Sequence, residues 1–586
     1  MAKKQIMAFP YRQRAILLVD LSQESWQKII LSEADAKSLL GGRLLALSLW
    51  DRYASYDSLD SKLYEVGNPV VIASGAASDT SMLCADSSTI VTRSPVTGKL
   101  AVNSNSSTLS KTLLGCGYSA LVIIGRSRRL CSLEIDSQKV TFSNAEHFHA
   151  MTTSEVQNHF RDRPLLSIGP AGEQQVPYAS VVYSGLNITR GGVGMVFGLK
   201  NLKFILFQSI ASGRESYDTE ELGLCTKRYR SLLARTEIGK AMQVEGSATL
   251  LKKANKHGWA AIDNYSLRVD GRLWGLCPKV QPTAQAGEGP VCVGCPIVAT
   301  SSSSNKNILD LSSLMALGSN LELFDSRRVS LLVQRCSDNG LDPISVGSIL
   351  SWARKTRKEG GLSFLPDLES FTVMQYMQIV DAIAYRKGTG EQLAEPFSKL
   401  VSKYGGSDHA YMVDAQALPP FDYRGLPSQA ILAATGDDTL VFAELMYGNR
   451  YHRGNERKLA RWAVFSQDLR YAMESLGLCN WLSIPFYENF LITFPHLLRP
   501  KNAWKLLAKL TSLSEGYQVT PQMISEIGTK TWSVQQQIDN RLLNRSGRYG
   551  SLPEPLLVDA TSNYHASQIV PLARLLDAYW SLRGIV

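Results

Sequence analysis

Two cysteines at metal-ligand spacing, Cys292 and Cys295, stand in the loop "GPVCVGCPIVATSSS" (289–303). Thiolates separated by two residues in a glycine- and proline-containing loop are typical of iron–sulfur and zinc sites. A cluster loop normally offers a third thiolate soon afterwards, but Ala299 and a run of serines follow here. The loop is therefore a metal site that lost a ligand, a site that takes a ligand from elsewhere in the chain, or no metal site.

Two glycine-rich turns could also bind a ligand. They are "SIGPAGE" (167–173) and "RGGVG" (190–194). Glycine tolerates positive φ and lets backbone N–H groups approach a phosphate or a flat heterocycle. Tight turns without a ligand have the same composition, so these residues alone leave both interpretations open.

The composition indicates a soluble, multidomain protein. The chain has 586 residues, of which 44% are hydrophobic and 19% charged, which is enough for several domains with large cores. No apolar run approaches the length of a membrane span, and the N-terminus lacks the long apolar segment of a secretory signal. Nine cysteines, mostly solitary, favour a reducing cytoplasm over a disulfide framework.

The formal net charge of +10 is spread along the chain in short runs such as "KKANKH" (252–257) and "RKTRKE" (354–359). Solvated helix faces explain such runs, and docking of an acidic protein is the functional alternative. No basic motif interleaved with aromatic residues accompanies the charge, so no nucleic-acid partner is expected.

The elements that must position these residues change character along the chain. Short β-branched segments bounded by turn residues predict strands, with one helix at 34–53 among them; the strand segments are 15–21, 69–76, 88–94, 119–126, 139–144 and 203–209. Later, Val373, Met377, Val380 and Ala384 recur at helical spacing and form one buried helix face. The sequence predicts an α+β fold, with a β-rich N-terminal domain (1–208) followed by two mainly helical domains (209–413 and 414–586).

The order of the motifs resembles the aldehyde ferredoxin oxidoreductase family, tungsten-dependent enzymes that oxidise aldehydes to carboxylic acids. The resemblance spans nearly the whole chain, and its motifs are "GGR" (41–43), "NPVVIASGAASDTS" (68–81), "TRSPVTG" (92–98), "GCGYSALVIIG" (115–125), "SIGPAGE", "RGGVGMVFGLKNLKFI" (190–205), "CVGCP" (292–296), "ALGSNL" (316–321), "NGLD" (339–342), "FDYRG" (421–425), "LGLC" (476–479) and "LRG" (582–584). It implies a base of two sheets, two helical domains above the base, and a cofactor between them.

The cofactor implied by the resemblance is tungsten, or molybdenum, held by two pterins whose phosphates share a magnesium ion. Electrons would pass through a four-cysteine iron–sulfur cluster to a ferredoxin-like acidic carrier. The cofactor contacts carried over to this sequence are Asn103, Ser104, Ile188, Arg190, Gly191, Gly192, Asp342, Glu474 and Leu478. The cluster ligands carried over are Cys292, Cys295 and Cys479, with Ala299 at the fourth position.

The sequence departs from the family pattern at several chemical positions. Serine stands where the family has an acidic pterin contact, an arginine and a glutamate near the metal, at Ser337, Ser87 and Ser312 respectively. Phe442 and Glu444 stand where a histidine and a lysine are expected, and phenylalanine cannot transfer a proton. Asp310 is the one carboxylate near Ser312 and is a weak catalytic candidate.

The missing cluster ligand leaves several alternatives open. Cys84 or Cys277 could replace the thiolate absent at Ala299, or a zinc ion could bind Cys277, Cys292, Cys295 and Cys479, or the thiols could be buried and reduced.

Two functional hypotheses follow. The first is a divergent oxidoreductase that keeps the metal–pterin cofactor, because the metal needs no protein ligand. The second is a non-catalytic paralogue or partner subunit of an active homologue, and a cofactor carrier is a third hypothesis without a signal of its own. A homo- or heterodimer is compatible with either of the first two. The family's interfacial iron site falls near Leu331 and Gln334, so no bridging iron is expected.

Overall fold

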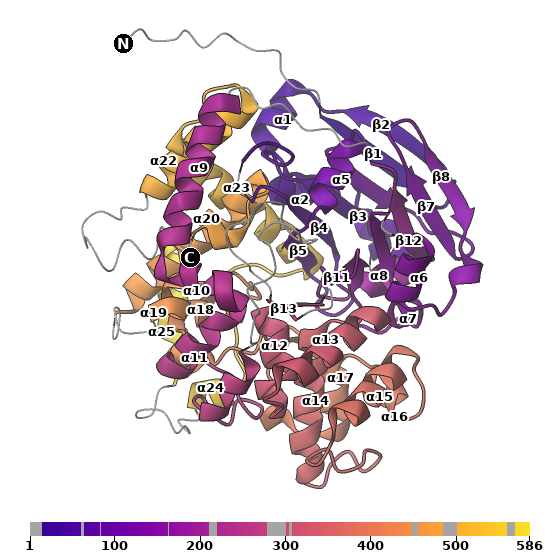
Figure 1. Cartoon of the computed structure of the whole chain (residues 1–586), viewed down its shortest axis with the longest axis vertical. Helices are drawn as coiled ribbons and strands as arrows, with labels where there is room; N and C mark the ends of the chain where they lie inside the picture. The colour runs from indigo at the N-terminus through magenta and orange to yellow at the C-terminus, as the bar shows by residue number, and fades with distance from the viewer. Residues whose placement is uncertain are drawn as a thin grey trace.

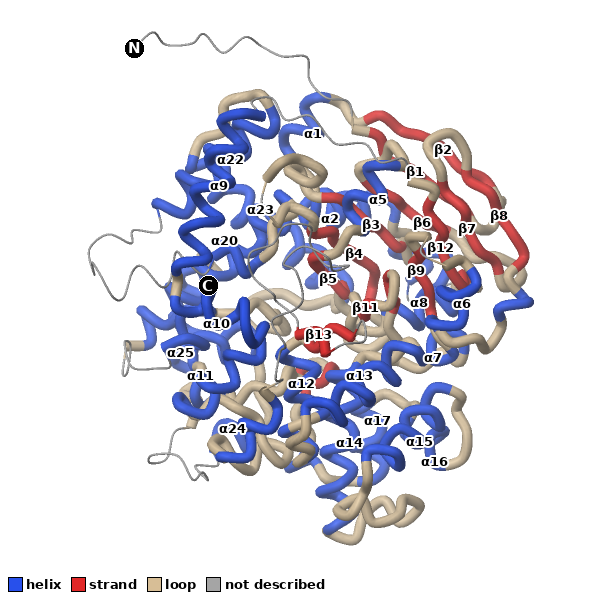
Figure 2. The backbone as a smooth tube through the Cα atoms, viewed as in Figure 1, coloured by secondary structure: helices blue, strands red, loops and turns tan. Residues whose placement is uncertain are grey.

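The computed structural model describes residues 14–59, 64–82, 84–161, 163–209, 219–277, 301–303, 307–447, 455–483, 501–558 and 569–585. Two β-sheets form one side of the molecule, and helices cover the other side and the base of the view (Figure 1). Figure 2 shows that the strands are confined to the N-terminal part, apart from short two-stranded ribbons.

The first sheet has six strands in the order β2-β1-β6-β3-β4-β5. Its strands are β1 (Ala15–Asp20), β2 (Ser25–Ile30), β3 (Val70–Ser74), β4 (Ser87–Arg93), β5 (Leu100–Ser106) and β6 (Ala120–Ile124). Only β1 and β6 run parallel among these neighbours, so the sheet is mixed. Strand β5 is its inner edge.

The second sheet also has six strands, in the order β11-β10-β9-β12-β7-β8. Its strands are β7 (Cys131–Ile135), β8 (Val140–Asn144), β9 (Leu165–Ile168), β10 (Val181–Tyr183), β11 (Leu186–Asn187) and β12 (Leu202–Phe207). Buried aliphatic side chains of both sheets, such as Leu17, Ile72, Leu133 and Ile205, share one core cluster. The two sheets therefore pack against each other through their alternating apolar faces.

Helices flank both sheets and link them. They are α1 (Glu33–Leu39), α2 (Gly42–Tyr53), α3 (Tyr56–Leu59), α4 (Tyr64–Gly67), α5 (Leu109–Gly115), α6 (Thr153–His159), α7 (Pro170–Glu173) and α8 (Val193–Leu199). Leu47 and Trp50 of α2 pack on Val71 of the first sheet, which covers the face opposite the second sheet.

The region that follows is largely helical. Its helices are α9 (Thr219–Arg235), α10 (Glu237–Glu245), α11 (Leu250–His257), α12 (Leu311–Leu317), α13 (Ser326–Asn339), α14 (Pro343–Lys358), α15 (Val373–Ala384), α16 (Thr389–Leu393), α17 (Phe397–Tyr404), α18 (Pro427–Ala434), α19 (Phe442–Tyr447), α20 (Glu456–Leu476), α22 (Lys501–Glu515), α23 (Pro521–Leu542), α24 (Pro555–Val558) and α25 (Leu572–Leu582). Helix α20 packs on α23 and α25, and both α20 and α23 contact α2 beneath the first sheet.

The predicted fold class is confirmed: two sheets come first and a largely helical region follows. The division of that region at residue 413 stays a prediction. Each predicted strand segment overlaps an observed strand, whereas the prediction of one continuous helix at 34–53 is wrong. Leu39 ends α1 and Gly42 begins α2, because Gly42 has φ +45° and a Cβ there would lie 2.0 Å from the Glu474 carbonyl oxygen.

Across the described part of the chain, every helix is too short or too polar to cross a membrane.

Candidate functional site

The inner edges of the two sheets meet at Asn103 and Arg190. The Asn103 Oδ1 atom accepts the Arg190 backbone N–H at 2.7 Å, and Asn103 Nδ2 donates to the Arg190 carbonyl at 3.2 Å. Asn103 belongs to β5, and Arg190 follows β11, so this pair joins the edge strands of both sheets near the centre of the molecule (Figure 1).

Arg190 continues from that junction into the helical region. Its Nε atom lies 3.2 Å from Asp342 Oδ2, and Nη2 donates to the Ala417 carbonyl at 2.8 Å. The Asp342 side chain is only 2% exposed and caps α14 by accepting the backbone N–H groups of Ile344 and Ser345. Three predicted cofactor contacts, Asn103, Arg190 and Asp342, therefore lie together where the regions meet.

A ladder of hydroxyl groups crosses β4 and β5 beside this junction. Ser87 pairs with Ser106 and Thr89 with Ser104, each at 2.8 Å between oxygens. Ser87, where the resemblance predicts an arginine, thus pairs with the hydroxyl of Ser106.

The opposite face of the same two strands carries unsatisfied polar atoms. Ser88 and Asn105 are cross-strand neighbours, and Ser88 Oγ and Asn105 Nδ2 are buried without a hydrogen-bond partner among the described residues. Buried polar atoms without partners are costly, and they indicate a missing water or ligand. Predicted contact Ile188 is buried nearby in the core between the sheets.

Glu474 lies in a buried ionic cluster rather than at an open surface. Arg43 Nη1 contacts Glu474 Oε2 at 2.6 Å, and Arg470 Nε contacts Oε1 at 2.5 Å. The Arg43 guanidinium also stacks 3.7 Å from the Tyr471 ring centroid. Burial alone would raise the pKa of Asp437, but Arg470 and Arg43 hold it below its usual value.

A polar cavity of about 70 Å³ lies between Arg190 and the side chains of Asp437 and Tyr471. Residues from both sheets' edges and from the helical region line it, including Lys99, Arg190, Asp414, Asp437, Tyr471 and Asp539. Lys99 forms an ion pair with Asp414 across it. This volume has room for about two water molecules.

Glycines of the sequence motifs allow distant backbone segments to approach each other closely. A Cβ on Gly75 would lie 2.0 Å from the Cα of Gly477, and one on Gly169 would lie 2.3 Å from the Asn339 carbonyl carbon. Backbone hydrogen bonds accompany both contacts, from Ala77 to Leu476 and from Ser180 to Gly340. These glycines let the N-terminal domain dock on the ends of α20 and α13.

Gly191 and Gly192 also lie where a side chain would be crowded by neighbouring atoms. Both have positive φ, 73° and 78°. A Cβ on Gly192 would lie 2.4 Å from the Pro177 carbonyl oxygen, and one on Gly191 would lie 3.0 Å from the Ala101 Cβ. In the described structure these predicted cofactor contacts approach the chain itself, at the start of α8.

The positions expected to handle protons hold structural contacts. Phe442 is 1% exposed, and its ring centroid lies 4.9 Å from that of Trp481. Glu444 accepts the N–H groups of Ser428 and Gln429 at the start of α18. Burial raises the pKa of Glu444 to about 7, although these N–H groups act in the opposite direction.

Asp310, the weak catalytic candidate, is exposed and caps α12. Its Oδ1 atom accepts the N–H groups of Ser312 and Ser313 at 2.9 and 3.0 Å. Capping of this kind stabilises a helix and needs no catalytic role.

Cys479 and Cys84 lie side by side: the Cys479 N–H donates to the Cys84 carbonyl at 2.9 Å. Cys277 lies at the end of a short 3-10 helix, with Sγ 3.9 Å from the Ala248 carbonyl. Cys292 and Cys295 fall outside the described residues. Among the residues that are described, no three His, Cys, Asp or Glu side chains gather as metal ligands.

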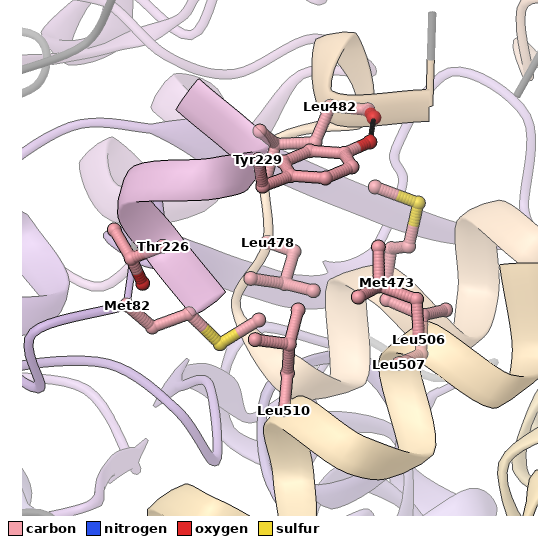
Figure 3. Close-up of a pocket in the computed structure, with 9 residues that line it drawn as sticks. All are labelled: Met82, Thr226, Tyr229, Met473, Leu478, Leu482, Leu506, Leu507 and Leu510. Atoms are coloured by element: carbon pink, nitrogen blue, oxygen red, sulfur yellow. Dashed lines mark hydrogen bonds between the residues drawn. The ribbon is translucent and has the colours of Figure 1, made fainter. Parts of the chain in front are cut away.

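Leu478, the last predicted cofactor contact, lines a small apolar pocket with Met82, Tyr229 and Met473 (Figure 3). Side chains of α22 close the opposite wall of the pocket.

The sequence prediction missed Arg43, Arg470 and Lys99 as members of the site. Arg470 and Glu474 are spaced i,i+4 on one helix, a signal that predicts their contact. Arg43 belongs to the "GGR" motif, but its partner lies 431 residues away, so no local pattern indicates the pair.

Comparison of structures defines the class first: a two-sheet base with a helical region attached. The chain matches a chain of the active-site complex BamBC of benzoyl coenzyme A reductase, in complex with 1,5-dienoyl-CoA, with a TM-score of 0.79. The match covers 98% of this chain and 95% of that chain at 18% sequence identity, so it establishes the fold.

Sequence comparison then gives the family. Residues 16–209 match the N-terminal domain of aldehyde ferredoxin oxidoreductase, and residues 224–586 match its domains 2 and 3. The chain belongs to the aldehyde ferredoxin oxidoreductase family, as its motifs predict.

Two relatives from Pyrococcus furiosus show how far the sequence has diverged. The tungsten-containing aldehyde ferredoxin oxidoreductase is 24% identical, over 94% of this chain and 92% of the relative. The WOR-like subunit of aliphatic sulfonate oxidoreductase is 23% identical, over 89% and 85% respectively.

Proposed function

We propose that this protein is an oxidoreductase that binds a tungsten or molybdenum bis-pterin and acts on the aldehyde or oxo group of its substrate. The observation that carries the proposal is the junction of Asn103, Arg190 and Asp342 at the inner edges of both sheets. It joins the edge strands of both sheets to the helical region, between which the resemblance implies a cofactor, and it has a cation beside an amide and a carboxylate.

The residues present fit the phosphate and magnesium end of such a cofactor. Arg190 supplies a positive charge beside the Asn103 amide, which is bonded to the Arg190 backbone, and the backbone near Ile188 supplies carbonyl groups. Ser104 faces the other side of β5, where its hydroxyl pairs with Thr89, so it does not join this group. The unsatisfied atoms of Ser88 and Asn105 lie on the same strands.

The pterin-ring end fits less well. Both Glu474 oxygens already accept from arginines, and the Asp342 oxygens cap a helix. We therefore assign neither carboxylate a step in the reaction, and no described residue is assigned to proton transfer.

When bound, the metal–pterin group supplies the two-electron redox chemistry. The chain supplies orientation and a dry setting: Arg43, Glu474 and Asp342 are almost fully buried and hold the helical region on the sheets. A ferredoxin-like acidic protein of the cytoplasm is the proposed electron acceptor, since the chain carries a net charge of +10.

Metal analysis of purified variants tests the proposal. Protein from cells supplied with tungstate and molybdate should contain about one such atom per chain. Arg190→Met should lose most of it. Arg163→Met, which removes a half-exposed cation paired with Glu134 on the second sheet, should retain it. Equal metal content in both variants would refute the assigned site.

A second candidate function, a non-catalytic partner subunit, is favoured by the Arg43–Glu474–Arg470 cluster and by the packing of Phe442 on Trp481. Such a protein would be folded and metal-free, and would form a stoichiometric complex with a tungsten-containing homologue. Metal analysis of this chain purified alone distinguishes the two functions, because the oxidoreductase needs its own metal whether or not it forms a complex. Mass photometry of the mixed pair then tests whether a metal-free chain forms the complex.

A further inference from the structure

A hollow of about 490 Å³ lies between helices α10 and α11 and the 3-10 helix η3 (Gly271–Leu276) (Figure 1). Its size is within the range of about 300–1,000 Å³ that is typical of small-molecule sites. Three lysines, one carboxylate and one indole are among the side chains that line it. Its lining shares no residue with the junction of Asn103, Arg190 and Asp342, so the hollow is a separate feature of the molecule.

Helix α11 presents a basic face to this hollow. The buried side chains of the helix lie on another face and are those of Leu250, Leu251, Ala254 and His257. Lys252 and Lys256 are exposed, and Lys253 is half-buried. Because residues four apart are neighbours on a helix surface, Lys252 and Lys256 lie one turn apart on the same side. All three ammonium-bearing side chains line the hollow.

The hollow lies within a strongly basic stretch of the chain. Residues 222–257 contain eight Lys or Arg residues and two Glu residues, a formal charge of +6 out of +10 for the whole chain. A concave surface with one sign of charge concentrates ligands of the opposite sign. The charge therefore favours an anionic ligand.

Trp274 supplies a flat apolar surface at the edge of the hollow. Leu273 and Leu276 anchor η3 in the core and are 1% and 0% exposed. Trp274 lies between them in sequence but remains 51% exposed, and it lines the hollow. An exposed indole beside cations is a surface on which a nucleobase stacks.

Two polar residues of the lining suit a sugar. Glu237 Oε1 lies 3.0 Å from Lys253 Nζ, and the Glu237 side chain is 67% exposed. A carboxylate repels phosphate but accepts hydrogen bonds from ribose hydroxyls, as acidic residues do in other nucleotide sites. Asn255 Oδ1 accepts the Asp270 N–H at 2.8 Å, which directs the Nδ2 group of Asn255 away from that bond as a donor.

We propose that this hollow binds a nucleotide with at least two phosphates, such as ADP. Lys252 and Lys256 contact the phosphates, Trp274 stacks on the base, and Glu237 accepts from the ribose. An acidic protein would be attracted by the same charge, but a specific protein interface needs about 800 Å² on each partner and no hollow. Binding makes and breaks no covalent bond, and it does not depend on the metal–pterin group.

The test is calorimetric titration of the full-length protein with ADP, pyrophosphate and adenosine at low ionic strength. ADP should bind with a Kd below about 1 mM and more tightly than either fragment, because only ADP uses both the lysines and the indole. Raising sodium chloride should weaken ADP binding through screening. Absence of ADP binding, or pyrophosphate binding as tight as that of ADP, would overturn the proposal. Binding of polyglutamate without binding of ADP would also overturn it, in favour of an acidic protein partner.

Variants locate the site. The double variant Lys252→Ala, Lys256→Ala should weaken ADP binding by about tenfold or more. Trp274→Ala should weaken it by about tenfold, whereas Trp274→Tyr should keep most of the affinity, because tyrosine still stacks. Lys240→Ala is the control for charge, since Lys240 is exposed on α10 and is not among the described residues that line the hollow. Trp26→Ala removes a tryptophan of β2 that is 37% exposed and is the control for the indole.

Both controls should bind ADP as the wild type does. Equal affinity of the wild type and the lysine double variant would refute the assigned site, as would equal losses in Lys240→Ala and in that double variant. Circular dichroism melting confirms that each variant is folded. Tungsten or molybdenum content is measured in the same samples, so that failure of the nucleotide site and failure of the proposed oxidoreductase function are observed separately.

Discussion

Arg43 and Glu474 form a buried ion pair, with 2.6 Å between Nη1 and Oε2, across 431 residues of sequence. Their side chains are 4% and 5% exposed. Arg43 lies in the first turn of α2 beneath the first sheet and Glu474 in the last turn of α20, so the pair fixes the helical region to the N-terminal domain. The position that the family resemblance assigns to a pterin contact thus also contributes to domain assembly.

Glu474→Gln should destabilise the protein, because it leaves Arg43 and Arg470 buried with an uncompensated charge. Removing one partner of a buried pair costs about 3–5 kcal/mol. Denaturant unfolding followed by circular dichroism measures the change. Glu33→Gln, which removes an exposed pair with Lys37, is the control and should change stability by less than about 1 kcal/mol. Equal losses of stability in the two variants would show that the buried cluster contributes no more to stability than an exposed ion pair.

Glu444 should make stability fall as pH rises. Burial raises its pKa in the folded protein from 4.5 to about 7, so the folded state binds more protons than the unfolded state between these values. Stability is then greatest below pH 4.5, as far as this group is concerned, and decreases up to about pH 7. Melting temperatures of wild type and Glu444→Gln, taken from pH 5 to 8, measure the difference. Parallel pH profiles would contradict the assignment.

Gly75→Ala should disrupt the docking of the N-terminal domain on α20. The new Cβ would lie 2.0 Å from the Gly477 Cα, and overpacking of this kind costs about 1–3 kcal/mol or more. Gly223→Ala is the control, since a Cβ there meets nothing within 4 Å in helix α9. That change should be neutral or stabilising by up to about 1 kcal/mol. Thermal unfolding of both variants makes the comparison.

Lys203 and Glu173 should show strong energetic coupling beneath the "SIGPAGE" turn. The Lys203 side chain is fully buried and forms an ion pair with Glu173, and burial lowers the pKa of Lys203 despite that partner. Lys203→Met should cost about 3–5 kcal/mol by leaving the carboxylate unpaired. The double variant with Glu173→Gln should lose less than the sum of the single changes, and simple additivity in a double-mutant cycle would refute the coupling.

Much of the sheet architecture follows from local sequence pattern. Segments such as 119–126 combine β-branched residues with turn residues at their ends, and β6 forms there. Of the predicted stripe, Val373, Val380 and Ala384 are buried, and Met377 is partly buried against the same core. Strand β5 lacks this signal because its sequence, "LAVNSNS", is polar. It pairs with β4 through backbone bonds and hydroxyl contacts that no periodicity indicates.

The contacts of the candidate site could be predicted less completely from the sequence. Motif order predicts that Asn103, Arg190 and Asp342 lie near one another, and these residues do lie together. The partners of Glu474 and the neighbour of Cys479 depend on how distant segments pack. A single sequence contains no local signal for such contacts.

The most direct test of the account is elemental analysis of the wild-type protein by inductively coupled plasma mass spectrometry, after expression with tungstate and molybdate. We expect about one tungsten or molybdenum atom per chain, retained through gel filtration. A folded protein that elutes without either metal would contradict it and leave the partner-subunit function in its place.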